Sequence, residues 1–234
     1  MKSKQTGFTL VEIAIVLVII GLLLGGVLKG QELINSAKVK NFATDFRTIP
    51  LYIYGYQDKF KAIPGDDRDS VTHVGTGATQ VALAPTGTAG NGRLDGNWWD
   101  GATALATSES VAFWEHVRRA NLAAGPSTIA TDANLPTNAD GNRIGIEGGS
   151  STAANQYISG LAGTYIICSA GILGKFAKQL DVTMDDGELA TGSVRGVAGQ
   201  PTTRANAAAC SKTGAVTGCT VADDTAPYTI CMSF

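Results

Sequence analysis

One acidic residue lies inside a long apolar segment near the start of the chain. Every residue from Phe8 to Leu28 is apolar except Thr9 and Glu12. On insertion scales a charged carboxylate costs about 2.5–3.5 kcal/mol at the centre of a bilayer, and less near its edge. Such a group either stays hydrated at the membrane interface or pairs with a cation, and the sequence offers no cation near Glu12. A newly formed α-amino group on a neighbouring chain would supply one.

The segment that carries Glu12 is long enough to cross a membrane. Its 21 residues correspond to about 31 Å of helix at about 1.5 Å per residue. Because Lys2 and Lys4 precede it, the positive-inside rule predicts a cytoplasmic N-terminus, with the chain after Lys29 on the other side of the membrane. The alternatives are an ordinary cleaved secretory signal, which has a shorter apolar stretch followed by small residues, and an uncleaved anchor.

The residues around Glu12 form a specific motif. The chain reads Gly7-Phe8-Thr9-Leu10-Val11-Glu12 after a short leader with lysines, and this resembles the class III signal of type IV prepilins and type II secretion pseudopilins. The resemblance implies that a prepilin peptidase cleaves between Gly7 and Phe8 and N-methylates Phe8. It also implies that Glu12 pairs with the Phe8 ammonium group of an adjacent subunit. Opposite charges attract strongly at low dielectric, whereas either charge alone is costly there.

The same resemblance implies a fold, partners and a location. The fold is α+β, a pilin fold in which a long N-terminal helix packs against the antiparallel β-sheet of a C-terminal head. We therefore expect a leader over 1–7, a transmembrane and filament-core helix over 8–28, an amphipathic stalk helix over 29–63 and a disulfide-stabilised head over 64–234. The implied partners are homologous pilin subunits, the prepilin peptidase, the inner-membrane assembly platform and the membrane. The precursor would span the inner membrane once, with its head in the periplasm, and then join a filament.

The stalk region shows a helical pattern of large apolar residues. Spacings of 4, 3, 4, 3 and 4 separate Phe42, Phe46, Ile49, Ile53, Tyr56 and Phe60. This spacing places them on one face of a helix, which we expect to pack against the head and not in a coiled coil. Pro50 predicts a kink or the loss of one backbone hydrogen bond. The sequence Pro64-Gly65-Asp66-Asp67 predicts the turn that ends the helix.

The rest of the head mixes one helix with short β-prone segments. We expect a helix over 108–124, with Ser108 as its N-cap and with Arg118 and Arg119 facing outward. We expect strands over 157–168, 176–182, 192–197 and 228–232. The adjacent Trp98 and Trp99 are expected either to cover the core beneath a loop or to expose one ring for contact with another subunit or a ligand.

Four cysteines follow the apolar segment, on the oxidising side of the membrane. They are Cys168, Cys210, Cys219 and Cys231, and four cysteines allow three pairings. We expect Cys210 to pair with Cys219 across a short loop, and Cys168 to pair with Cys231 because both lie in predicted strands. A zinc site is the alternative, but the chain has no Cys-x-x-Cys spacing and neither histidine lies near the cysteines in sequence.

Oxygen-bearing side chains alternate with glycines between residues 65 and 107. Among them Asp66, Asp67, Asn91 and Asp95 are candidate ligands for calcium, a cation that prefers oxygen ligands. Their spacing does not match an EF-hand loop. The alternative is a series of Asx-type turns, which the same residue types favour.

The sequence gives little support to an enzyme. It contains no His-Glu-x-x-His, no Gly-x-Ser-x-Gly and no phosphate-binding Gly-Lys-Ser/Thr motif. We expect His73 and His116 to be solvated at the surface, because no catalytic partner is visible for either. Asp185-Asp186-Gly187 predicts a turn.

Charge argues against a nucleic-acid partner. The 234 residues include 18 Lys and Arg against 20 Asp and Glu, a formal net charge of -2, whereas phosphate contacts dominate DNA affinity. Only a cluster of Arg118, Arg119, Lys175 and Lys178 would favour DNA. We therefore expect a pilin-like structural subunit, either a pilin or a minor pilin. The alternatives are a type II secretion pseudopilin and a tip-located minor pilin that acts as an adhesin or binds DNA.

Overall fold

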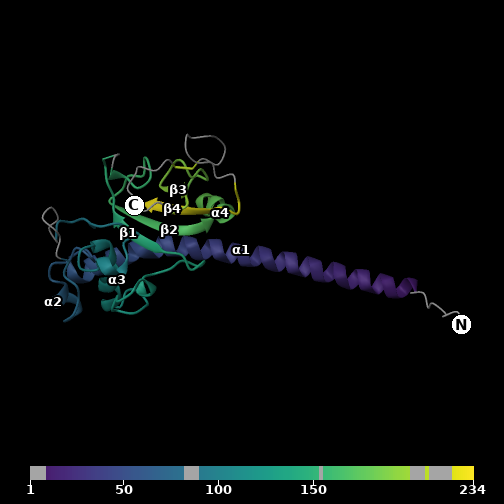
Figure 1. Cartoon of the computed structure of the whole chain (residues 1–234), viewed down its shortest axis with the longest axis horizontal. Coiled ribbons are helices and arrows are strands. Elements are labelled where there is room, and N and C mark those ends of the chain that lie inside the picture. Colours follow the sequence, from purple (N-terminus) through teal and green to yellow (C-terminus); the bar gives the residue numbers. More distant parts are fainter. Residues whose placement is uncertain (1–8, 82–89, 153–154, 201–208, 211–222) are drawn as a thin grey trace. The chain divides into compact units, whose positions relative to one another are not determined.

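The computed structural model describes residues 9–81, 90–152, 155–200, 209–210 and 223–234. The chain forms two compact units, Met1–Lys38 and Val39–Phe234. Helix α1 (Leu10–Phe60) begins in the first unit and ends in the second, and the other described elements belong to the second (Figure 1). The second unit is the head, and it includes the last turns of α1.

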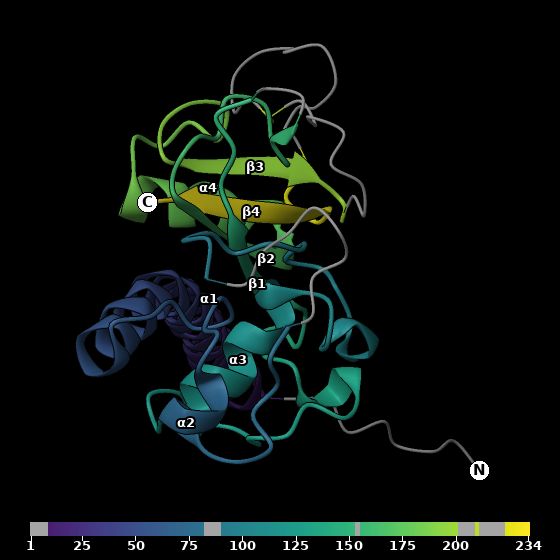
Figure 2. The same ribbon diagram turned by 90° about the vertical axis from the view of Figure 1, so that its left-hand side faces the viewer.

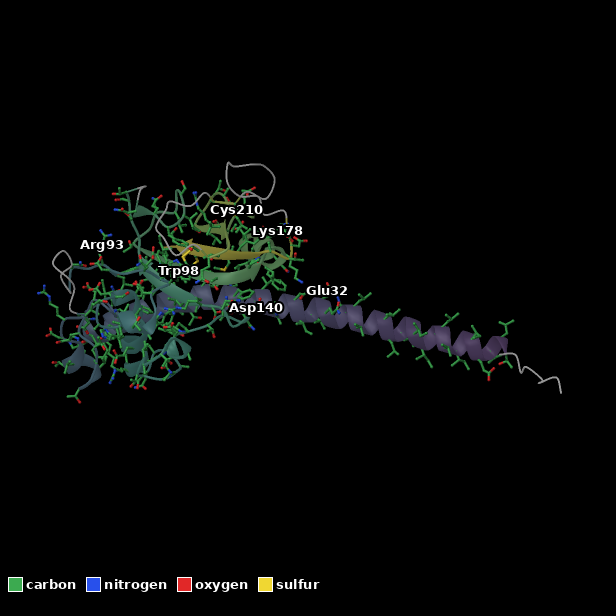
Figure 3. The ribbon with its side chains drawn as sticks, in the orientation of Figure 1. Glu32, Arg93, Trp98, Asp140, Lys178 and Cys210 are labelled. Atoms are coloured by element: carbon green, nitrogen blue, oxygen red, sulfur yellow. A yellow bond between two sulfur atoms is a disulfide. The ribbon has the colours of Figure 1, made fainter. Side chains whose placement is uncertain are left out.

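The N-terminal part of α1 buries none of its apolar side chains. Its large hydrophobic residues from Leu10 to Leu28 are 45% to 89% exposed, and they project from the helix on all sides (Figure 3). The helix continues without a break through Gly21, Gly25 and Gly26. Among the described residues, α1 is the one helix long and apolar enough to cross a membrane. A contiguous apolar surface of this kind is typical of a membrane or protein contact.

The part of α1 that belongs to the head has the predicted apolar face. Its buried residues are Val39, Phe42, Ala43, Phe46, Ile49, Ile53 and Tyr56. Phe60, the last residue of the predicted face, is only partly buried. Pro50 lies inside the helix, which continues past it to Phe60. The spacing of the apolar residues therefore correctly predicted which face of the helix packs.

The sheet has four antiparallel strands in the order β1-β2-β4-β3 (Figure 2). The strands are β1 (Ile144–Gly148), β2 (Tyr165–Leu173), β3 (Val194–Ala198) and β4 (Pro227–Ser233). The register of β2 and β4 places Cys168 opposite Cys231. A long apolar helix packed against an antiparallel sheet is the α+β pilin-like architecture that the sequence predicts.

Both faces of the sheet are covered. On β2, Tyr165 and Ile167 belong to the larger core cluster, which also contains the buried face of α1 and residues of α3 (Glu109–Arg119). The alternate residues Ile166 and Cys168 belong to a second cluster with Trp98 and Tyr157. Because successive side chains of a strand point to opposite faces, β2 is apolar on both.

Several predicted elements of the head were wrong or misplaced. Residues 176–182 form no strand but lie in helix α4 (Gly174–Met184). In α4, Phe176, Ala177 and Leu180 are buried, and their spacing is helical. Helix α3 ends at Arg119 and not near residue 124, because Asn121 adopts a left-handed conformation with φ 59°. The first part of the predicted strand 157–168 is not a strand, and β1 was not predicted.

Residues 94–98 join the long segment between residues 65 and 107 to strand β1. This segment contains α2 (Ser70–Val74) and the 3-10 turn η1 (Ala102–Ala104), and a second 3-10 turn, η2 (Asp132–Asn134), precedes β1. The N–H of Gly148 donates to the Leu94 carbonyl at 2.8 Å, and the Trp98 N–H donates to Glu147 at 3.0 Å. Trp98 is 1% exposed and packs edge-on against Tyr157. Trp98 therefore covers the core, the first of the two predicted alternatives.

Candidate functional site

Glu12 and Thr9 are joined by reciprocal hydrogen bonds at the start of α1. The Thr9 backbone N–H donates to Oε2 of Glu12 at 2.8 Å, and the Thr9 hydroxyl donates to the same oxygen at 2.7 Å. In return, Oγ1 of Thr9 accepts the Glu12 N–H at 3.3 Å. This is a capping box, which satisfies two of the amide groups that a helix start leaves without partners. Sequence reasoning missed the role of Thr9, although Thr-x-x-Glu before an apolar segment is its signature.

The capping box changes how the Glu12 carboxylate is to be understood. Within a single chain the carboxylate already has donors, and it lies in the first helical turn, where the helix dipole favours a negative charge. It is exposed together with the apolar residues that follow it. A neighbouring ammonium group would therefore add to an existing set of contacts. Gly7 and Phe8, the predicted processing residues, lie outside the described part of the chain.

His116 joins three segments of the head. Its Nδ1 accepts the Gly65 N–H at 2.9 Å, and its Nε2 lies 2.8 Å from the Thr79 carbonyl oxygen. Since Nδ1 is an acceptor, the ring proton is on Nε2 and is donated to Thr79. The side chain is completely buried, and burial lowers the pKa of His116 below its ordinary value of 6.5. The prediction that His116 is a solvated surface residue was wrong.

His73 has a partner that the sequence did not reveal. Its Nδ1 lies 2.7 Å from Oδ2 of Asp67, and the Tyr56 hydroxyl donates to the same oxygen at 2.7 Å. The Asp67 side chain is only 2% exposed, whereas that of His73 is 26% exposed. The ring of His73 also stacks on Phe60. His73 is thus part of a contact between α1 and α2 and is not simply solvated as predicted.

The four candidate calcium ligands do not face one common centre. The Asp66 carboxylate accepts hydrogen bonds from the backbone amides of residues 90–92. Asp67 faces Tyr56 and His73, and the Asn91 amide donates to Asp95 at 2.9 Å. Asp66 therefore joins the turn after α1 to the 90–92 loop. The Asx-type turns of the alternative occur at Asp67 and Asn91, whose Oδ1 atoms accept the N–H of Asp69 and of Arg93. Calcium binding by these residues stays a prediction.

Glu109 is a buried acid that sequence reasoning did not single out. It is 0% exposed at the start of α3, and its Oε2 accepts the Asp95 N–H at 2.8 Å. Its Oε1 has no hydrogen-bond partner in the described part of the chain. Burial, followed by the nearby charges of Asp66 and Asp95, raises the pKa of Glu109 to about 8. The carboxyl group is therefore largely neutral at pH 7.

A second acidic group lies at the end of α4. Asp181, Asp185 and Asp186 have carboxylate oxygens within 4.8 Å of one another. Asp185 accepts the Val194 N–H at 2.9 Å, and Asp186 accepts the Thr191 hydroxyl at 2.6 Å. These contacts belong to the turn that leads into β3, as Asp-Asp-Gly predicts.

A disulfide joins Cys168 of β2 to Cys231 of β4. The prediction of this pair is confirmed, and it rested on the two residues lying in strands. The bridge belongs to the second core cluster, with Trp98 and Tyr157. Figure 3 labels Cys210 on the head, but Cys219 lies outside the described residues, so the second pair stays a prediction.

The basic cluster does not form an exposed positive surface. Arg118 is 7% exposed, so its predicted outward orientation was wrong. Arg119 pairs with Glu115 at 2.9 Å, and Lys178 pairs with Asp224 at 2.8 Å. Acidic neighbours therefore offset the charges of Arg119 and Lys178, and the charge of Arg118 is buried.

Comparison with known proteins supports the N-terminal assignment. Residues 2–28 match the family described as "Prokaryotic N-terminal methylation motif". This class III signal is typical of type IV pilins and pseudopilins, and it implies processing by a prepilin peptidase and filament assembly. Searches of curated proteins and of solved structures found no match.

The N-terminal motif and the fold are both of a pilin-like kind. The motif contains Glu12 and continues into α1, whose large apolar side chains from Leu10 to Leu28 are 45% to 89% exposed. The head combines the end of α1 with an antiparallel sheet. Proteins of this pilin-like type are generally structural subunits without enzymatic activity. The chain therefore carries a prokaryotic N-terminal methylation motif, which is typical of type IV pilins and pseudopilins, and its fold has the α+β pilin-like architecture.

Proposed function

We propose that the protein is a structural subunit of a type IV filament, either a pilin or a minor pilin. In this proposal residues 1–7 are a leader that the prepilin peptidase removes, and Phe8 becomes the methylated N-terminus. Residues 8–28 form the membrane and filament-core helix, 29–63 the stalk, whose last turns pack into the head, and 64–234 the rest of the head. The precursor spans the inner membrane with its head in the periplasm, and the assembly platform then transfers it into the filament.

The proposal rests on two features of α1, which are a charged residue at its start and an exposed apolar surface after it. Glu12 is exposed and accepts hydrogen bonds from Thr9. The large apolar residues from Ile13 to Leu28 are at least 45% exposed. In a bundle of such helices the apolar surfaces would be buried against each other. An adjacent Phe8 ammonium group would then lie close to the Glu12 carboxylate, where water is scarce and the attraction is strong.

Intact-mass analysis of the protein from its native host tests the processing step. We expect the loss of residues 1–7 together with the addition of one methyl group. A full-length product would contradict the proposal and would favour a simple membrane-tethered protein.

Substitution of Glu12 tests the assembly step separately. We expect Glu12→Val and Glu12→Gln to be processed normally but to enter filaments poorly, because the neighbour's ammonium group loses its partner. Glu32→Gln is the matched control, since Glu32 lies on the same helix and forms an exposed ion pair with Lys29. If Glu12→Val enters filaments as readily as the wild type, the assembly role of Glu12 is refuted.

The location of the filament distinguishes a pilin from a type II secretion pseudopilin. A pilin or minor pilin is recovered in fibres sheared from the cell surface, whereas a pseudopilin stays with the cell envelope. The large head, over residues 64–234, favours the pilin assignment. For a tip-located DNA-binding minor pilin, the net charge of -2 and the buried Arg118 are unfavourable.

A further inference from the structure

A cavity of about 430 Å³ lies in the head between α1 and the segment that follows α3. Helix α1 contributes Asp45 and Tyr52 to its wall, and α3 contributes Trp114 and Arg118. All of these residues belong to the second compact unit. The cavity is separate from the Glu12 segment and from the acidic residues after α1. Its volume is in the range of small-molecule sites.

Arg118 is held in the cavity wall with unused hydrogen-bonding capacity. It is 7% exposed, and its Nη1 donates to the carbonyl oxygens of Pro126 and Asn134 at 3.2 Å and 2.6 Å. Its Nε has no partner among the residues that the structure describes. Burying a cation is costly unless its donors are satisfied. The two carbonyls fix the guanidinium group and leave further N–H groups for an acceptor.

Asp45, which α1 contributes to the same cavity, needs a hydrogen-bond donor. Its carboxylate is partly buried, and no hydrogen bond or ion pair joins it to any described residue. Desolvation alone raises the pKa of Asp45 to about 6. A desolvated carboxylate without a donor is unfavourable unless a bound group supplies one.

Two aromatic side chains line the same cavity as these charged groups. Tyr52 lies seven residues after Asp45 on α1, on the same face of the helix, and both line the cavity. Trp114 is 4% exposed, and its indole N–H has no hydrogen-bond partner in the described part of the chain. The wall therefore combines one acceptor, one cationic donor and two aromatic rings.

We propose that this cavity is a carbohydrate-binding site that holds one pyranose ring between Asp45 and Arg118. Sugar hydroxyls both donate and accept hydrogen bonds, so a neutral ring can donate to Asp45 and accept from Arg118 at once. The C–H face of the ring packs against Tyr52 or Trp114. A ligand with a single charge would be repelled by one of the two groups. A free amino acid matches both charges but not the aromatic walls.

Ligand-detected saturation-transfer NMR on the full-length protein tests this proposal. The protein is kept in a polyoxyethylene detergent, because sugar-based detergents would compete for the site. The probes are the methyl glycosides of glucose, galactose, mannose and N-acetylglucosamine, with glycine as the zwitterionic probe. We expect saturable binding of at least one glycoside with a Kd of about 1 mM or tighter and no binding of glycine.

Two variants assign the binding to this cavity. Asp45→Asn keeps the shape of the side chain and is expected to weaken binding about tenfold or more, because a charged acceptor is lost. Thr48→Phe places a ring in the cavity, whose wall includes Thr48, and is expected to abolish binding. Asp58→Asn is the control, since Asp58 is an exposed residue of the same helix that pairs with Lys61.

Each of three results would overturn the proposal. The first is the absence of saturable binding by every glycoside, which would mean that only water fills the cavity. The second is binding of glycine in place of a sugar. The third is binding that both Asp45→Asn and Thr48→Phe leave unchanged relative to Asp58→Asn.

Discussion

The backbone N–H of Gly65 donates a hydrogen bond to Nδ1 of His116, at 2.9 Å. Through this bond the turn that ends α1 is fixed to the middle of α3. The opposite ring nitrogen reaches the Thr79 carbonyl, and the ring stacks on Tyr56 of α1. One imidazole therefore holds together the stalk, the loop after α2 and helix α3.

Replacing His116 should destabilise the head strongly. His116→Ala would leave the Gly65 N–H and the Thr79 carbonyl without partners and would open a cavity in the core. We expect a loss of about 3 kcal/mol, measured by thermal or urea unfolding. His73→Ala is the control, because that side chain is 26% exposed and should cost clearly less. Equal losses in the two variants would contradict the role assigned to His116.

The pH dependence of stability should reflect Glu109. The pKa of its carboxyl is about 8 in the folded chain against an ordinary value of 4.5. The stability that the neutral carboxyl contributes is therefore complete below pH 4.5 and is lost as the pH rises through 8. We expect Glu109→Gln, which stays neutral, to flatten the decline in unfolding free energy between pH 5 and pH 8. Urea unfolding at several pH values measures this, with Asp58→Asn as control, and an unchanged slope would refute it.

The disulfide should contribute a large share of the head's stability. We expect the double variant Cys168→Ala/Cys231→Ala to lose about 2–4 kcal/mol of unfolding free energy. Peptide mapping without reductant should recover the 168–231 bridge and, as predicted from the sequence, a bridge between Cys210 and Cys219. If Cys210 pairs with a cysteine other than Cys219, the second assignment is wrong.

Glycine is needed at position 145 for steric reasons. A Cβ at Gly145 would collide with the backbone carbonyl of Trp98, which cannot move without separating the 94–98 segment from β1. We expect Gly145→Ala to lower the midpoint of thermal unfolding by several degrees. Gly30→Ala is the control, since the space around Gly30 is open and alanine favours a helix. A similar midpoint in both variants would show that the 94–98 segment adapts.

The parts of the fold that depend on local spacing could be predicted from the sequence. The apolar face of α1 follows from residues three and four apart, and the Cys168–Cys231 bridge follows from two β-prone segments. The spacing of Phe176, Ala177 and Leu180 also predicts a helix, but the β-prone residues around them led to the wrong assignment. The capping box of Thr9 and Glu12 could also be predicted from the Thr-x-x-Glu spacing. The predicted membrane position of Glu12 pointed only to an intermolecular partner.

Other features depend on segments that are distant in sequence. Strand β1 has the sequence Ile-Gly-Ile-Glu-Gly, which is not a typical strand sequence. Its glycines leave room for the backbone of residues 94–98, and Glu147 accepts the Trp98 N–H. From the sequence alone, His116 resembles a surface residue of a charged helix. Only the fold shows that Gly65 and Thr79 contact its ring. The burial of Glu109 and Arg118 likewise depends on loops far along the chain. Local periodicity contains no information about such contacts.

The strand order has a consequence for how the head folds. Strand β4 follows the other described strands in sequence, yet it lies between β2 and β3 and pairs with both. The sheet can therefore close only after β4 has been made, and under the proposed function only after β4 has crossed the membrane. Without β4, the inner edges of β2 and β3 would both lack a partner. Damage to this one strand would therefore divide the sheet at its centre and not shorten it at an edge.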